Sequence, residues 1–188
     1  MTQLRDADLS PMRLEDVPEG YPRALEEWVS VGKGGRIFLR PIAPADATRM
    51  GHALEFGDPE TIQRRFLTGA PPKGHGAIEY LVTLDYRYRL AIIAMDDDGN
   101  SIGIGRYEGS EGSESAEVAI VVDPQWRHRG VGSVLLRHLE SHARSIGIER
   151  FIALYQPDNT GVAALLKSIG YQPAPMMDGL VAVTKSLD

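Results

Sequence analysis

The spacing of apolar positions along the chain predicts a mixed α/β fold. Short apolar runs bounded by turn residues predict strands at 37–39, 90–95, 101–107, 117–122 and 151–155, and a terminal hairpin within 173–185. Apolar residues at helical spacing predict helices at 46–56, in two pieces within 58–84 with a break at 69–72, at 130–145 and at 160–169. This order predicts a mostly antiparallel sheet of six to seven strands flanked by helices, with one parallel crossover late in the chain.

The first 35 residues differ from the rest in their pattern. Prolines interrupt this stretch, and closely spaced glycines end it with a turn. We therefore expect an N-terminal arm at 1–35, in which a short amphipathic piece at 24–29 docks on the body. The remaining residues, 36–188, have the length of one domain.

Composition narrows the range of functions. The chain has no cysteine, which excludes disulfides, thiolate metal sites and a covalent cysteine mechanism. Its polar start does not resemble a secretory signal, and no apolar run approaches the roughly 20 residues of a membrane helix. We expect a cytoplasmic protein without a membrane partner. The formal charge of −6 argues against nucleic acid as a partner and suits a cationic substrate.

The stretch with the most specific chemistry is 121–133, where an apolar strand gives way to a long helix. Gly130 and Gly132 open that helix, whose first N–H groups lack intrahelical acceptors and form the positive end of its dipole. Glycine lets these amides approach phosphate oxygens without an intervening Cβ. Arg127 and Arg129 add positive charge at the same place. The loop therefore predicts a phosphate site.

Two other phosphate-binding patterns do not fit the sequence. The Walker pattern ends in Gly-Lys-Ser/Thr, which is not present. The dinucleotide fingerprint needs a third glycine that Gly103 and Gly105 lack, and both lie inside a predicted strand. A nucleotide-dependent dehydrogenase is therefore not expected.

The run Arg127-x-x-Gly130-x-Gly132 resembles the Q/R-x-x-G-x-G/A signature of the GNAT superfamily of acyl-CoA-dependent N-acyltransferases. Asn159 with the later Gly170-Tyr171 resembles the second motif of that superfamily. The resemblance covers about residues 36–185 and implies a GNAT-type sheet. Further stretches are similar to Pat-type protein lysine acetyltransferases: Tyr21-Pro22, 39–42, 59–62, Arg65-Phe66, 83–86, Arg106-Tyr107 and 116–119.

The resemblance implies acetyl-CoA as cosubstrate, with no metal. In the superfamily two neighbouring parallel strands splay apart and hold the pantetheine arm, and here these would be the strand ending at Val122 and the strand at 151–155. Backbone amides at the start of the next helix would hold the pyrophosphate. The expected cofactor-binding residues are Ile120, Val121, Val122, Arg127, His128, Arg129, Gly130, Val131, Gly132, Ser133 and Asn159.

The acceptor amine requires a general base. A lysine amine has a pKa of about 10.4 and is protonated at neutral pH, so a side chain or a water must remove its proton. We expect Glu117 in this role, because it begins the strand that leads to the loop and aligns with the glutamate base of Pat-type enzymes. Alternation places Glu117 on a mostly apolar face with Ala119 and Val121, which predicts a buried or cleft carboxylate. The alternative is a solvent-facing strand residue.

The group that protonates the leaving thiolate is not assigned. Many GNAT enzymes use a tyrosine seven residues beyond the motif asparagine, where this chain has Leu166, a departure that Pat-type sequences commonly share. Tyr155 and Tyr107 are alternatives. Water is another, because a thiol has a pKa of about 8.5.

Three other features carry no predicted site. His138 and His142 lie on one helix face, but no third zinc ligand accompanies them. The acidic stretch 96–100 lacks the ligand spacing and terminal glutamate of an EF-hand loop, and fits a hairpin turn. Met176-Met177 is interpreted as packing rather than as an acyl pocket.

Three functions remain open. The first is acetyl transfer to a lysine of another protein, with an acyl-CoA synthetase as one candidate. The second is acetyl transfer to a small amine, and the third is a non-catalytic acyl-CoA-sensing module. The sequence leaves the acceptor, the acyl-chain preference and the oligomeric state open.

Overall fold

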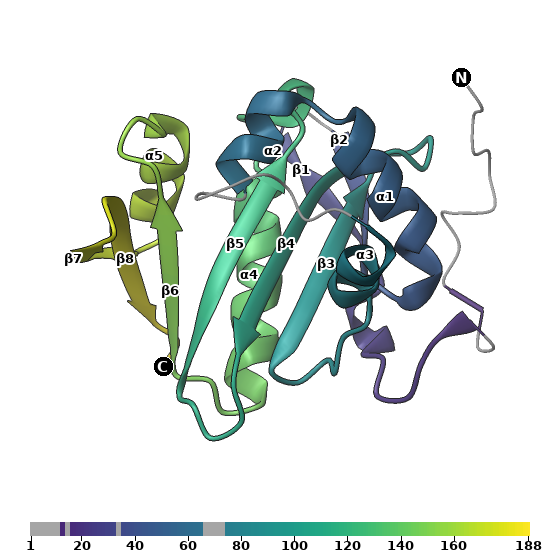
Figure 1. The fold of residues 1–188 in the computed structure, drawn as a ribbon, viewed down its shortest axis with the longest axis horizontal. Helices are drawn as coiled ribbons and strands as arrows, with labels where there is room; N and C mark the ends of the chain where they lie inside the picture. The colour runs from purple at the N-terminus through teal and green to yellow at the C-terminus, as the bar shows by residue number, and fades with distance from the viewer. Residues whose placement is uncertain (1–11, 14–15, 33–34, 66–73) are drawn as a thin grey trace.

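An eight-stranded sheet organises the part of the chain that the computed structural model describes, which is residues 12–13, 16–32, 35–65 and 74–188. The strands are β1 (Glu27–Val31), β2 (Gly35–Pro41), β3 (Arg89–Met95), β4 (Ser101–Gly109), β5 (Ser115–Val122), β6 (Arg150–Tyr155), β7 (Gln172–Met177) and β8 (Leu180–Ser186). The helices are α1 (Ala47–Phe56), α2 (Pro59–Arg65), α3 (His75–Val82), α4 (Val131–Ser145) and α5 (Thr160–Ser168). Figure 1 shows them as a twisted sheet with helices on both faces.

The strand order of the sheet is β1-β2-β3-β4-β5-β6-β8-β7. Neighbouring strands are antiparallel except β5 and β6, which run parallel and are connected through α4. The predicted mostly antiparallel sheet with one late parallel crossover is thus confirmed. In Figure 1, α4 lies behind β3, β4 and β5, with which it is in contact, whereas α1, α2 and α3 lie in front of the sheet.

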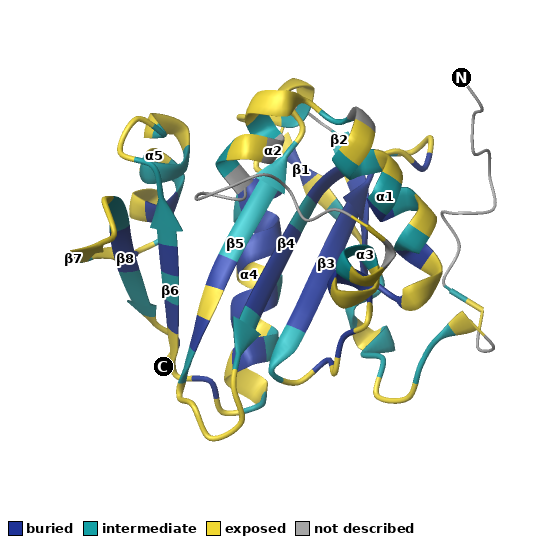
Figure 2. Cartoon of the chain, viewed as in Figure 1, coloured by how far each residue is buried: buried dark blue, intermediate teal, exposed yellow. Residues whose placement is uncertain are grey.

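Helix α4 follows directly from the apolar spacing in the sequence. Val131, Leu135 and Leu139 recur on one face of the helix and are buried against the sheet. Gly130 precedes the helix with φ 89°, and Gly147 follows it with φ 88°, so a left-handed residue marks each end. Figure 2 shows β3 as an almost continuously buried strand, which explains its uniformly apolar sequence.

The sheet has one strand more than the six to seven predicted, and the extra strand is β1. It forms within the segment that the sequence pattern marks as an arm: the stretch at 24–29 is divided between a 3-10 turn (Arg23–Leu25) and the start of this strand. Strand β1 pairs antiparallel with β2 at the edge of the sheet, and of its side chains only Val31 is buried. An edge strand with so little buried surface leaves a weak apolar pattern, which explains why it was missed.

Several predicted features lie outside the described residues. These are the parts of the arm at 1–11, 14–15 and 33–34, the helix break at 69–72, and Phe66. The two predicted helical pieces on either side of that break are present as α2 and α3. In the described part of the chain, no helix is both long enough and apolar enough to pass through a lipid bilayer.

Candidate functional site

The parallel strands β5 and β6 separate part of the way along their length. Their register consists of Ser115 opposite Arg150, Ala116 opposite Phe151 and Glu117 opposite Ile152. Beyond this point β5 continues to Val122 and β6 to Tyr155 without pairing to each other. The backbone of β5 therefore has one edge without a strand partner from Ala119 onward, and its N–H and C=O groups there are available to a ligand.

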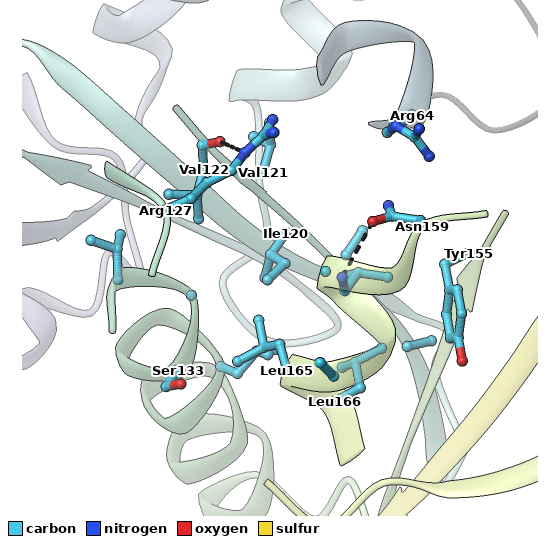
Figure 3. A pocket seen from close by; sticks show the side chains of 18 of the residues that line it. Arg64, Ile120, Val121, Val122, Arg127, Ser133, Tyr155, Asn159, Leu165 and Leu166 are labelled. Atoms are coloured by element: carbon cyan, nitrogen blue, oxygen red, sulfur yellow. Dashed lines mark hydrogen bonds between the residues drawn. The ribbon is translucent and has the colours of Figure 1, made fainter. Parts of the chain in front are cut away.

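A cavity of about 710 Å³ lies at this separation. Its walls come from β5, β6, the loop before α4, the first turns of α4, helix α5 and one side of α2. Figure 3 shows Ser133 of α4 on one side, Leu165 and Leu166 of α5 on the other, and Arg64 of α2 above them. Of the predicted cofactor-binding residues, the cavity is lined by Ile120, Val121, Val122, Arg127, His128, Gly130, Val131, Gly132, Ser133 and Asn159.

The loop before α4 has the backbone geometry of an anion site. His128 has φ 58° and Gly130 has φ 89°, so two residues of the loop are left-handed. The first bond of the helix runs from Val134 N–H to the Gly130 carbonyl, 3.0 Å, which leaves the N–H groups of Val131, Gly132 and Ser133 without acceptors inside the helix. The left-handed conformation of His128 is disfavoured for a non-glycine residue. Residues held in disfavoured conformations concentrate at functional sites.

Gly132 lies where α4 packs closely against α5 and β5. A Cβ at this position would lie 2.9 Å from Leu165 Cδ2 and 3.2 Å from Ile120 Cδ1. An added Cβ would therefore require the ends of the Leu165 and Ile120 side chains to shift.

The two arginines of the loop have different surroundings. Arg127 lines the cavity and donates to Thr61 Oγ1 at 2.7 Å and to the Val122 carbonyl at 3.3 Å, so its guanidinium connects the loop to α2 (Figure 3 shows the second bond). Arg129 lies outside the cavity lining, and its guanidinium packs on the Trp126 ring with 4.9 Å to the centroid. The sequence pattern predicted cofactor binding for both, and the structure brings only Arg127 to the cavity.

Asn159 begins α5 as its N-cap. Its Oδ1 accepts from the N–H of Val162 at 3.2 Å, the usual capping bond (Figure 3). Because the cap uses only the oxygen, the Nδ2 amide group of Asn159 keeps its donors for a ligand in the cavity. Asn159 lines the cavity, and its contact to the pantetheine arm stays a prediction.

Glu117 lies where β5 and β6 separate, and it lines the cavity while its residue is exposed. The residue is not buried: it is exposed, as the alternative of a solvent-facing strand residue expected, and it also lines the cavity. Three carboxylates of the described residues line the cavity. Glu60 and Asp158 are both paired with Arg64, whereas the side chain of Glu117 makes no hydrogen bond or ion pair with another described residue. It is the carboxylate available to receive a proton.

The candidate proton donors for the thiolate differ in their position relative to the cavity. Tyr107 is buried away from the cavity, and its hydroxyl donates to the Arg87 carbonyl and contacts His142 Nδ1 at 2.9 Å. Burial raises the pKa of the Tyr107 hydroxyl far above its usual value, which disfavours its tyrosinate. Tyr155 and Leu166 line the cavity. Tyr155 is thus the tyrosine that the described part of the structure brings to the site.

Helix α2 contributes residues that the sequence pattern did not indicate. Glu60, Thr61 and Arg64 line the cavity, and Arg64 bonds both oxygens of Asp158 at 3.1 and 3.2 Å. Together with the bond from Arg127 to Thr61, this pair connects α2 to both sides of the cavity mouth. The stretch 59–62 stood out in the sequence only through its similarity to Pat-type enzymes, because a short exposed helix has little apolar pattern.

The histidines and methionines for which the sequence predicts no site have different surroundings in the structure. His138 contacts Glu27 Oε1 at 2.7 Å and His142 contacts Tyr107, so the two histidines have different partners. The described residues contain no group of three or more candidate metal ligands. Met176 and Met177 are 63% and 52% exposed, which contradicts their interpretation as packing residues.

Known proteins with a similar sequence or fold are acetyltransferases and acyltransferases. The profile of the acetyltransferase (GNAT) domain family matches residues 36–172. The chain is 32% identical over 146 residues to acetyltransferase Pat of Mycolicibacterium smegmatis, covering 76% of this chain and 43% of that protein. It thus spans less than half the length of that relative. It is 25% identical over 150 residues to an acetyltransferase of Pseudomonas aeruginosa, covering 78% of this chain and 81% of that protein.

Among solved structures, the GNAT domain of S. lividans PAT superposes with a TM-score of 0.81 and 28% identity, covering 88% of this chain and 99% of that one. A mutant of a cAMP-binding acyltransferase from Mycobacterium smegmatis superposes with a TM-score of 0.61 and 26% identity, covering 86% of this chain and 47% of that one. Both agree with the resemblance that the loop and the second motif indicate.

Proposed function

Because this chain belongs to the GNAT family of acetyltransferases, we propose that it transfers an acetyl group from acetyl-CoA directly to a lysine side chain of another protein, with Glu117 as general base. The observation that carries the proposal is the position of Glu117. Glu117 is exposed to solvent, and it lies beside the cavity at the point where β5 and β6 begin to separate.

In this proposal the cavity holds the cofactor. The pantetheine arm lies along the free edge of β5 and pairs with backbone groups of Ile120, Val121 and Val122. The Asn159 amide donates to the arm from the opposite side. The unpaired amides at the start of α4 hold the pyrophosphate, with the charge of Arg127 beside them.

The reaction then needs one base and one set of oxyanion donors. The acceptor amine gives a proton to Glu117, directly or through a water, and its nitrogen attacks the thioester carbonyl carbon. A backbone N–H of β5 stabilises the negative charge on the carbonyl oxygen. The carbon–sulfur bond breaks, the nitrogen loses its second proton as the amide forms, and the thiolate of CoA gains a proton in exchange, relayed by water or by Tyr155.

The open side of the site favours a protein lysine as acceptor. Glu108 lies directly opposite Glu117 in the register of β4 and β5, so the two carboxylates share one face of the sheet. Glu117 is exposed there, and Glu108 is fixed by Tyr80 at 3.0 Å and by Arg106 at 3.3 Å. A carboxylate open to solvent suits a lysine presented by a large partner, whereas a small amine is better held by a closed pocket. Relatives named Pat support the same assignment.

The test measures release of free CoA from acetyl-CoA with lysine peptides, intact acyl-CoA synthetases and small amines. The native protein is compared with Glu117→Gln and with Glu111→Gln, which makes the same change of charge in an exposed turn of the described structure. Turnover on proteins that Glu117→Gln loses and Glu111→Gln keeps, with CoA binding unchanged, supports the proposal.

Other outcomes identify the two alternatives. Turnover on small amines alone would make the protein a metabolite acetyltransferase. CoA binding without turnover on any acceptor would make it an acyl-CoA-sensing module.

A further inference from the structure

The N-terminal strand β1 touches the cofactor loop and the helix that follows it at two separate points. The N–H of Gly32, the residue after β1, donates to the carbonyl of Arg129 at 2.9 Å. At the other end of the strand, Glu27 Oε1 lies 2.7 Å from Nε2 of His138 on α4. A segment outside the matched family domain, which begins at residue 36, therefore holds the element that is expected to bind the pyrophosphate.

The Arg129 carbonyl is the part of the loop that this contact fixes. Arg129 stands between the two left-handed residues His128 and Gly130. Both neighbours line the cavity, whereas Arg129 does not. A left-handed histidine is held only where its surroundings impose it. The bond from Gly32 is such a constraint, because it anchors the outer side of the loop while the amides on the inner side remain free.

Gly32 fits this contact because it has no side chain. A Cβ there would lie 3.3 Å from the Arg129 oxygen, closer than such atoms normally approach. Its φ lies outside the left-handed region, so the backbone conformation alone does not require glycine. The close approach to the loop carbonyl explains the residue.

We propose that Gly32 is a positioning residue for the pyrophosphate of acetyl-CoA: its N–H holds the Arg129 carbonyl and thereby presets the amides of the loop for the phosphate oxygens. This inference rests on the proposed place of the cofactor in the site. A preset loop binds more tightly because it loses less conformational freedom when the ligand arrives.

The test uses two substitutions of Gly32 and a matched glycine. Gly32→Pro removes the N–H donor, and Gly32→Ala keeps the donor but adds the crowding Cβ. Gly35→Ala is the control, because a Cβ at Gly35 meets only Val31 Cγ2, at 3.4 Å. For each protein we would measure the Kd of CoA, KM and kcat for acetyl-CoA, the same constants for S-acetylpantetheine, and the melting temperature without ligand.

We expect Gly32→Pro to raise the Kd of CoA and the KM of acetyl-CoA roughly tenfold and Gly32→Ala to raise them severalfold, with kcat unchanged. The constants for S-acetylpantetheine, which has no pyrophosphate, should stay at the native level, and Gly35→Ala should behave as native. Should Gly32→Pro fail to fold, Gly32→Ala decides. Native affinity for CoA in folded Gly32→Pro would overturn the inference, and so would native affinity in Gly32→Ala if that is the variant that folds. An equal loss with both acetyl donors would also overturn it.

A loop variant separates this inference from the function on which it rests. Gly130→Ala forces a side chain into a position with φ 89° and should weaken CoA binding through the loop itself. If Gly130→Ala binds CoA as the native protein does, the proposed place of the cofactor is wrong. If Gly130→Ala is weakened and the Gly32 variants are not, the cofactor is placed correctly and the role of Gly32 is wrong.

Discussion

Glu117 and Ile152 form the last residue pair of the parallel strands β5 and β6. Up to this pair the strands are paired in the sheet. Beyond it a cavity of about 710 Å³ opens between them. Glu117 thus places a carboxylate where the two strands separate. In the proposed function the reacting end of the pantetheine chain lies between the strands at this place. The proposed base and the proposed cofactor site therefore follow from one feature of the sheet.

The buried ion pair beside α1 is predicted to matter far more for stability than a surface pair. Arg40 bonds both oxygens of Asp46 at 2.6 and 2.7 Å, and both side chains are 5% exposed. Arg40→Met would leave the Asp46 carboxylate buried without its main partner, which typically costs about 3–5 kcal/mol of unfolding free energy. Chemical denaturation measures the loss.

The surface pair of Arg36 and Asp97 provides the comparison for that prediction. These side chains are 64% and 59% exposed, and their nearest atoms are 2.7 Å apart. Asp97→Asn should change the unfolding free energy by less than about 1 kcal/mol, because solvent screens the pair. Similar losses for Arg40→Met and Asp97→Asn would show that burial does not control the strength of these pairs.

The stability of the fold should fall as the pH drops below the usual titration range of histidine. His142 is half-buried beside Tyr107, and desolvation by burial lowers its pKa below the ordinary value of 6.5. In the folded protein this histidine thus resists protonation, whereas the unfolded chain takes up a proton at about pH 6.5. The unfolded state then binds more protons, so the unfolding free energy decreases as the pH falls through this value toward the lower folded pKa.

His142→Gln removes that proton from both states. Denaturation at a series of pH values should therefore show a smaller loss of unfolding free energy between neutral and mildly acidic pH than in the native protein. Identical pH dependence in the two proteins would mean that other groups cause the loss.

Gly132 offers a test of the cavity wall that does not depend on catalysis. A Cβ there would meet Leu165 Cδ2 at 2.9 Å and Ile120 Cδ1 at 3.2 Å, and all three residues line the cavity. The two contacts are ends of flexible side chains that can shift, and alanine favours the helix, so Gly132→Ala should cost less than about 1 kcal/mol of unfolding free energy. In calorimetry it should weaken CoA binding less than about threefold, since the superfamily signature accepts alanine at this position.

Gly76 is the matched control for that substitution. It lies in α3, is exposed, and a Cβ there would have no neighbour within 4 Å. Gly76→Ala should leave CoA binding unchanged and raise the unfolding free energy by about 0.5–1 kcal/mol, since alanine favours the helix. A Gly132→Ala protein stabilised as much as Gly76→Ala would contradict the close packing of α4 on α5 and β5.

The family, the sheet and the loop were predictable because each leaves a pattern in short stretches of sequence. Alternation along 117–122 and the spacing of Gly130 and Gly132 are local, and the structure places these residues together as expected. Strand β1 was not predictable, because its pairing with β2 buries so little of it. Thr61 and Arg64 were missed for a different reason: they reach the cavity through contacts with residues distant in the sequence, Arg127 and Asp158.

The two loop arginines, which look equivalent in the sequence, should differ in solution. Arg127 lines the cavity and bonds Thr61 Oγ1 at 2.7 Å, whereas Arg129 packs on Trp126 outside the lining. Arg127→Gln removes a positive charge beside the proposed pyrophosphate and a charge-assisted bond to α2, so the Kd of CoA should rise roughly tenfold. Arg129→Gln makes the same change of charge and should raise the Kd less than about threefold, because its guanidinium packs on Trp126 outside the cavity lining and the attraction at longer range is screened. Calorimetric titration of both variants with CoA decides, and a larger effect from Arg129→Gln would mean that the phosphate groups lie on the outer side of the loop.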